Sequence, residues 1–340
     1  VYNESTKTWT GTENVAKMPS WTAGKVYGNT TITMSNGHVM GNVYGGGNLG
    51  SVGKGNYAGG TDDYHPAGYG ETLQNAPLWT KTEGFDPNAP ITESNKPTTM
   101  ADYFLSSGKC TISITGGTVG TLNGLYGNTY GTSKGTPTGI VFGGSRGRAA
   151  QDVGTLSPRY EYAPDFFLGY VNNTEVTIGT ESSGDAPRIY SQVFGGARDG
   201  HVRGSAHVIV RNGKIGQTYA ETEAVGTTDV DYQRYHRGNV YGAGSGLGTW
   251  NGTNHGTSSG SVNRNTTVDI YGGTIYNNVY GGGAMATVGP PQIGTTAFAS
   301  SDWSKCTVNI YGGTIGSGKE YESVYMSDFD KYGLMMLHWK

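Results

Sequence analysis

Two arginines occupy the same position in two copies of a repeated motif. Arg146 follows V-F-G-G-S and Arg198 follows V-F-G-G-A. If the two copies form neighbouring parallel strands, the arginines lie about 5 Å apart. Adjacent guanidinium groups with free N–H donors bind carboxylate and sulfate groups. These positions predict a binding site for an acidic ligand such as an acidic polysaccharide, and we expect Arg148, Asp199 and Arg203 to belong to it. In an alternative interpretation, the arginines pair with nearby aspartates and only brace the loops.

An aromatic residue follows a valine in each copy of this motif. The six residues are Tyr44, Phe142, Phe194, Tyr241, Tyr280 and Tyr325. Because successive side chains of a strand point to opposite faces, the rings are expected to lie on the opposite side from the valines. Exposed rings would form a ladder suited to binding sugar faces. The alternative is that the stacked rings only stabilise the fold.

Motifs for catalysis and metal binding are weak. No G-x-S-x-G, H-E-x-x-H or nucleotide-binding glycine motif stands in a suitable context. Asp62 with Asp63, or Asp199 with Asp231, could form the acid pair of a glycoside hydrolase. Asp229 and Asp231 could hold a structural Ca²⁺. Beyond that calcium we expect no metal and no cofactor.

The histidines and cysteines favour structural roles. His201, His207 and His236 could meet in space, but the simpler interpretation is that they are hydrogen-bonded surface residues. Cys110 and Cys306 open equivalent K-C-T strings four repeats apart, which is roughly 19 Å at the spacing of β-strands. Disulfides need Cα atoms within about 7 Å. We therefore predict two free, buried thiols.

The motif belongs to a two-armed unit that returns about six times. The first arms begin at Thr30, Cys110, Thr174, Ala206, Thr266 and Cys306, and the second arms at Val43, Val141, Val193, Val240, Val279 and Val324. The first arm alternates apolar and polar residues, as in T-T-V-D-I, and is followed by glycines. This pattern predicts a short strand with one buried face.

The spacing of the units decides between two folds. Equivalent valines lie 98, 52, 47, 39 and 45 residues apart. A solenoid tolerates such irregularity, because one coil can lengthen at a corner without disturbing its neighbours. We predict an all-β fold, a right-handed parallel β-helix of about six coils with long loops on one side. The alternative is a β-propeller, which the paired glycines resemble.

The repeats indicate a single domain over residues 1–340. Residues 1–28 are expected to form an N-terminal cap, 51–107 a large insertion, and 328–340 a C-terminal cap or an interface. A net charge of −3, without a basic stripe, argues against nucleic acid as a partner. No apolar run is long enough to insert into a membrane. The chain begins at Val1 without an initiator Met or signal peptide, so we expect it to be part of a longer protein.

The repeated T-V-x-I-x-G-G-T-I and N-V-Y-G-G-G strings resemble the glycine-rich β-helix regions of very large secreted or surface proteins of anaerobic gut bacteria. The resemblance covers about residues 29–327. It implies an extracellular or bacterial cell-surface location. Such regions serve as adhesive stalks, as glycan binders and occasionally as carbohydrate-active enzymes.

Three functions follow as hypotheses. The first is a non-catalytic surface protein that adheres to a polysaccharide or a cell-surface glycan. The second is a polysaccharide lyase or glycoside hydrolase that acts on an acidic polysaccharide, with Arg198 as the candidate for removing the proton next to a uronate carboxylate. The third is a structural fibre subunit that associates with copies of itself.

Overall fold

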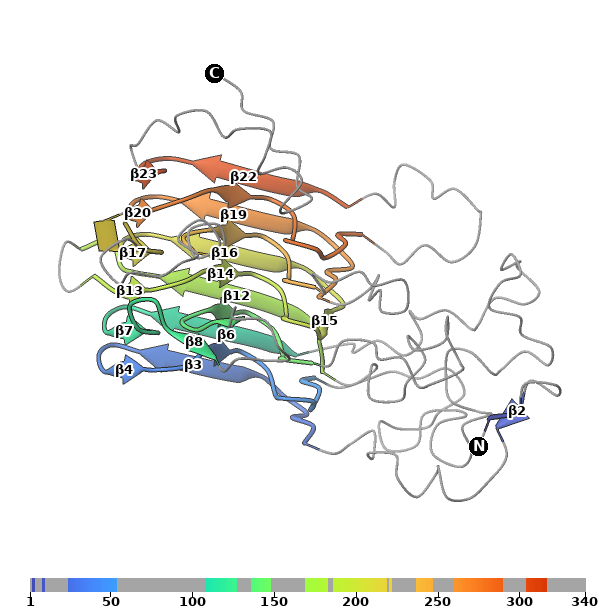
Figure 1. Cartoon of the computed structure of the whole chain (residues 1–340). Helices are drawn as coiled ribbons and strands as arrows, with labels where there is room; N and C mark the ends of the chain where they lie inside the picture. The colour runs from blue at the N-terminus through green and yellow to red at the C-terminus, as the bar shows by residue number, and fades with distance from the viewer. Residues whose placement is uncertain are drawn as a thin grey trace, which may run out of the picture.

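The computed structural model describes residues 2–3, 8–9, 24–53, 108–126, 136–147, 169–182, 186–218, 220–221, 237–246, 260–289 and 304–316. The named elements in these ranges, β1 to β23, are all strands. The chain is all-β, with parallel strands in stacked sheets (Figure 1). Residues 1, 4–7 and 10–23 of the cap expected at 1–28, nearly all of the 51–107 insertion and the whole segment 328–340 lie outside the described residues.

The six predicted first arms form one parallel sheet. Its strands are β3 (Thr30–Met34), β6 (Lys109–Ile114), β12 (Asn173–Ile178), β16 (Ala206–Val210), β19 (Thr266–Ile270) and β22 (Cys306–Ile310). They pair in chain order and in register, so that Val176, for example, is level with Ile112 and Val208. Buried and partly exposed residues alternate along β6 and β12, as the period of two requires. We number the repeats 1 to 6 after these strands.

Two further parallel sheets are built in the same way. One contains β4 (His38–Val39), β7 (Thr118–Val119), β13 (Arg188–Ile189), β17 (Lys214–Ile215), β20 (Thr274–Ile275) and β23 (Thr314–Ile315). The other contains the second arms β5 (Val43–Tyr44), β10 (Val141–Phe142), β14 (Val193–Phe194), β18 (Val240–Tyr241) and β21 (Val279–Tyr280). Each of repeats 1 to 5 therefore contributes one short strand to each layer, and the second arm of repeat 6 lies outside the described residues.

A fourth row of parallel contacts completes the described stack. It runs through Val26, Val52, β11 (Tyr170–Val171), β15 (His201–Val202), Val262 and Val288. Two short antiparallel pairs lie outside these layers, β1 (Tyr2–Asn3) with β2 (Thr8–Trp9) and β8 (Leu125–Tyr126) with β9 (Thr136–Pro137). The described repeats pair with one another in parallel, whereas a propeller blade is an antiparallel sheet of consecutive strands. The pairing rules out the propeller alternative.

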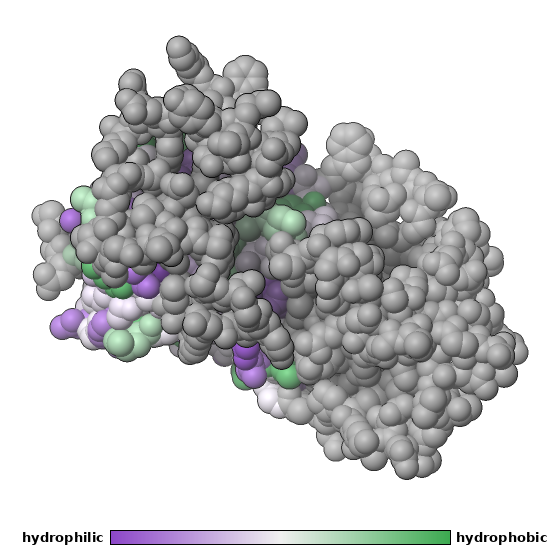
Figure 2. All heavy atoms as spheres, viewed as in Figure 1, coloured by the Kyte–Doolittle hydropathy of each residue, from purple (hydrophilic) through white to green (hydrophobic). Residues whose placement is uncertain are grey.

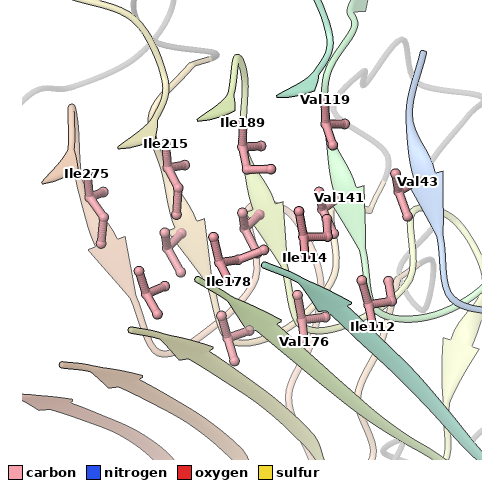
Figure 3. Packing of buried hydrophobic residues seen from close by; sticks show 14 of the residues in the cluster. Val43, Ile112, Ile114, Val119, Val141, Val176, Ile178, Ile189, Ile215 and Ile275 are labelled. Atoms are coloured by element: carbon pink, nitrogen blue, oxygen red, sulfur yellow. The ribbon is translucent and has the colours of Figure 1, made fainter. Parts of the chain in front are cut away.

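The core lies between the sheets. Inward-facing valines and isoleucines of all three sheets pack together, and Figure 3 shows Ile178, Ile189 and Ile114 among them. These three side chains are fully buried. Full burial of one such side chain contributes about 1.5–3 kcal/mol to folding, so this row of apolar residues is the main source of stability.

Alternate repeats differ in the residue that opens the first arm. Repeats 1, 3 and 5 have a threonine there, and each threonine hydroxyl donates a 2.6 Å hydrogen bond to a second-arm glycine carbonyl of its own repeat. The pairs are Thr30 with Gly45, Thr174 with Gly195 and Thr266 with Gly281. Repeats 2, 4 and 6 have Cys110, Ala206 and Cys306 in this slot. The stack therefore repeats structurally every two units.

The residue before the first arm follows the same alternation. Repeats 1, 3 and 5 place an asparagine there, and its side-chain oxygen accepts a hydrogen bond from a backbone N–H of the next repeat. The pairs are Asn29 with Lys109 (2.8 Å), Asn173 with Ser205 (2.9 Å) and Asn265 with Lys305 (2.9 Å). Each asparagine thus binds its own repeat to the following one.

The two cysteines are free, as predicted, but only one is buried. Cys110 lies inside the stack, where burial raises the pKa of its thiol to about 11, against the opposing effect of a hydrogen bond with Thr30. Cys306 is exposed, so the prediction that it is buried is wrong. The physical reason is that β22 is the last described strand of its sheet, so no further described repeat covers it.

Candidate anion-binding site

Backbone hydrogen bonds place the two predicted arginines in consecutive repeats. Both follow a second-arm strand. The Arg146 N–H donates to Gly47 of repeat 1 at 3.0 Å, and the Arg198 N–H donates to Ser145 of repeat 2 at 3.1 Å. Because these contacts continue the ladder of the parallel sheet, the main chain that carries the arginines is fixed by the stack.

Asp199 lies beside the two arginines. Its N–H donates to the Arg146 carbonyl at 2.8 Å, and its Oδ2 lies 3.4 Å from Arg198 Nε. Asp199 is buried, and this burial raises the pKa of its carboxyl group to about 6, although the charges of Arg198 and Arg146 act in the opposite direction. The structure therefore brings Arg146, Arg198 and Asp199 together around a recessed carboxyl group.

Arg146 is exposed and lightly held. Its Nη1 donates to the Asn48 side-chain oxygen at 3.1 Å, and Asn48 occupies the same slot in repeat 1. Arg198 keeps about a third of its side chain exposed and contacts Asp199 through Nε. In the part of the chain that the structure describes, the other N–H groups of both guanidiniums make no hydrogen bond to protein. They are available to an anion.

The pH dependence of stability tests the burial of Asp199. A native pKa of about 6, against an ordinary value of 3.8, means that the folded state binds this proton more tightly than the unfolded state. The free energy of unfolding should therefore fall as the pH rises from about 4 to 6, by up to about 3 kcal/mol for this group alone. We expect Asp199→Asn to remove this part of the slope in urea denaturation at pH 4.5 and 7.5. An unchanged slope would contradict a buried, ionising Asp199.

The other predicted charged residues are placed differently. Arg203 follows β15 in the fourth row, where its N–H donates to Val171 at 2.9 Å and its Nε is buried. Arg148 lies outside the described residues, as do Asp62, Asp63, Asp229 and Asp231. The acid pairs and the calcium site expected from these aspartates therefore stay predictions.

The histidine prediction was only partly right. His201 is buried rather than on the surface, because its ring stacks on Tyr170 with centroids 4.5 Å apart and its Nδ1 lies 3.3 Å from Ser261 Oγ. His207 is partly exposed, and its Nε2 lies 2.7 Å from Asp269 Oδ2. His236 lies outside the described residues.

The aromatic residues form a continuous stack. Neighbouring ring centroids are 5.0 Å apart from Tyr44 to Phe142 and from Phe142 to Phe194, 4.6 Å from there to Tyr241 and 4.8 Å to Tyr280. The planes are within 10° of parallel. Each inner ring therefore presents both faces to its neighbours, and a sugar cannot stack between them.

Burial further limits this ladder as a ligand site. Phe142 and Phe194 are only 1% and 2% exposed, whereas Tyr280 is 42% exposed. The edges of Phe142 and Phe194 are therefore covered as well as their faces, and their role in ligand binding stays a prediction. Tyr44 and Tyr241 are half-buried, and Tyr325 lies outside the described residues. The inner ladder is part of the packing.

Arg188 makes strong contacts that the sequence reasoning missed. Its Nη2 lies 2.8 Å from Glu221 Oε2, and its guanidinium packs over the rings of Tyr190 and Tyr276. Burial acts to raise the pKa of Glu221, but hydrogen bonds from Thr218 and the charge of Arg188 lower it overall. The T-Y-A-E string at 218–221 was the available signal, because it matches a capping box. The Thr218 and Glu221 side chains do bond each other's N–H groups in that way.

Comparison with known proteins adds no identification. No protein-family model, curated protein or solved structure matches the chain. Among the described residues, no cluster of three or more His, Cys, Asp or Glu side chains is placed to bind a metal ion. The same residues include no helix with the length and apolar character needed to cross a membrane.

Proposed function

We propose that the stacked sheets are the coils of a right-handed parallel β-helix, and that the chain is a non-catalytic binding protein for acidic glycans outside the cell or on a bacterial surface. One observation carries the ligand class. Arg146 and Arg198 stand in consecutive repeats, with N–H donors that make no hydrogen bond to another described residue. Parallel pairing holds such positions about 5 Å apart, so the two guanidiniums can bind neighbouring acidic groups of one polymer.

The neighbouring carboxyl group sets the charge of this site. With Asp199 ionised, the three side chains carry a net charge of +1, and protonation of Asp199 raises it to +2. Since burial places the pKa of Asp199 at about 6, binding of a polyanion should strengthen as the pH falls below that value. The rigid ladder beneath the arginines limits the entropy lost when a ligand binds.

Arg146→Gln and Arg198→Gln test this proposal. Each change is expected to weaken binding of a uronic-acid or sulfated polysaccharide by about 10-fold or more, because a hydrogen bond to a charged group contributes about 1.5–3 kcal/mol. Arg211→Gln is the matched control, since Arg211 belongs to another sheet corner, where it pairs with Glu181 and packs over Tyr271. Affinity electrophoresis or calorimetry with a neutral glucan as the reference polymer measures the effect.

The outcome separates this site from general electrostatic attraction. If all three variants lose binding equally, the polymer responds to net charge and the paired site is not the binding site. If none loses binding, the arginines only brace the loops.

A polysaccharide lyase or hydrolase is the second candidate, and one observation favours it. A carboxyl pKa of about 6 is suitable for a general acid near neutral pH. Turnover of acidic polysaccharides, followed by unsaturated-product absorbance and by new reducing ends with and without Ca²⁺, tests this function. Activity that is lost in both Asp199→Asn and Arg198→Gln would replace the non-catalytic proposal.

A further inference from the structure

One end of the stack exposes residues that face the core elsewhere. Strands β22 and β23 lie at this end, at the top of Figure 1. Val308, Ile310 and Ile315 are 37%, 59% and 37% exposed. Their counterparts in repeat 5, which are Val268, Ile270 and Ile275, are fully buried. The inward columns therefore continue to the last described strands, where their side chains are exposed.

The same end has a backbone edge. At each junction between described repeats, the residue after the first arm donates to the last carbonyl of the preceding first arm, as Thr115 does to Met34 at 2.8 Å and Tyr311 does to Ile270 at 2.7 Å. The equivalent acceptor at the edge is the carbonyl of Ile310. It receives no backbone hydrogen bond from the described residues. An unpaired parallel strand is a template for another strand.

The opposite end of the stack begins with repeat 1, at the bottom of Figure 1. Its inward residues Ile32 and Val39 are only partly buried and pack against the core from one side. Where Figure 2 shows described residues, hydrophilic and hydrophobic ones are interspersed.

The two ends of the stack fit the alternation between odd-numbered and even-numbered repeats. Repeat 6 opens with Lys305-Cys306 and repeat 1 with Asn29-Thr30. The junction from repeat 2 to repeat 3 already joins these two kinds of repeat, since Lys109-Cys110 lies beside Asn173-Thr174 in register. A repeat 1 placed on repeat 6 would therefore reproduce a junction that the chain contains.

We propose that copies of this chain associate head to tail, with repeat 1 of one copy stacking on repeat 6 of the next. Ile32 and Val39 would cover Val308 and Ile315 of the neighbour, and the N–H of Ser35 would reach the Ile310 carbonyl. The outward neighbours, Thr31 beside Thr307 and Thr33 beside Asn309, bring no like charges together. Because the two edges would reproduce a junction that the chain already contains, a second copy is the occupant that the repeats favour.

This contact joins two different surfaces, so each pair of copies keeps one free repeat 1 end and one free repeat 6 end. Heterologous contacts that do not close into a ring produce open chains of subunits. We expect the protein to form linear oligomers whose length grows with concentration. The inference does not depend on glycan binding.

Two variants that block opposite ends test the proposal. Ile310→Lys places a charge on the repeat 6 end, and Ile32→Lys places one on the repeat 1 end. Each variant alone should be monomeric in analytical ultracentrifugation, whereas an equimolar mixture should form 1:1 dimers and nothing longer. Thr307→Lys, an outward change on the same strand as Ile310, should assemble like the unmodified chain. Circular dichroism melting checks that each variant is folded.

The exposed thiol gives an independent readout. Cys306 should react quickly with a thiol reagent in dilute protein and slowly in concentrated protein, while buried Cys110 stays unreactive at both concentrations. An unmodified chain that remains monomeric at high concentration would overturn the proposal. Oligomers that persist in both single variants would also overturn it, because the contact would then lie elsewhere.

Discussion

Gly143→Ala is expected to prevent the chain from forming a stable stack. A Cβ atom added at Gly143 would lie 2.1 Å from the carbonyl oxygen of Gly195 and 3.1 Å from Cβ of Thr174. Neither neighbour can move away easily, because Gly143 and Gly144 donate to Phe194 and Gly196 at 2.9 and 3.1 Å in the same ladder. We expect a loss of more than about 3 kcal/mol in the free energy of unfolding, measured by urea denaturation.

Gly282→Ala is the matched control. Gly282 stands one position further along the second arm of repeat 5, and a Cβ there meets no atom within 4 Å. Its effect should stay within about 0.5 kcal/mol. If both substitutions cost the same, the close approach between repeats would not explain the glycine.

This comparison shows what the glycines contribute. Equivalent Cβ atoms at Gly45, Gly195 and Gly242 would lie 2.1, 2.3 and 2.3 Å from the carbonyl of the next repeat. These three glycines do not have positive φ angles, so close packing between repeats, and not turn geometry, excludes a side chain. The sequence alone could not separate these glycines from those at corners.

The strands were predictable where the pattern is repeated and regular. Six first arms alternate apolar and polar residues, and every one forms a strand that pairs in parallel with the neighbouring described repeats. The fourth row was not predicted, because its members are single valines such as Val52 and Val262, set among loops without constant spacing. The two-repeat alternation was visible as Asn-Thr against Lys-Cys or Ser-Ala. Only the hydrogen bonds of Thr30 and Asn29 show what this alternation does in the structure.

The sequence predicted the site only where its residues occupy equivalent positions of the repeat. Alignment alone placed Arg146 and Arg198 in equivalent positions, and the backbone ladder has them in consecutive repeats. The burial of Asp199 depends on how the chain packs around the end of the second arm. A charged residue in a glycine-rich segment gives no sequence signal of this packing. The sequence also left the exposure of the aromatic residues undetermined, because alternation shows only that they point away from the valines.

Phe194→Ala is the second change with a large expected effect. Phe194 is 2% exposed and stacks between Phe142 and Tyr241, with centroids 5.0 and 4.6 Å away. Removing this ring leaves a cavity inside the ladder and ends both stacking contacts. Truncation of a buried phenylalanine to alanine costs about 3–5 kcal/mol. We expect a loss of this size in urea denaturation.

Tyr280→Ala separates packing from ligand binding. Tyr280 belongs to the same ladder but is 42% exposed, so its removal should cost only about 1 kcal/mol. Binding of an acidic polysaccharide should be unchanged in this variant, because the proposed contacts are made by the arginines at the end of the second arm. If Tyr280→Ala instead weakens binding as much as Arg198→Gln while leaving stability intact, the exposed ring of Tyr280 belongs to the ligand site. The buried rings of Phe142 and Phe194 then act as the support that holds the Tyr280 ring in place.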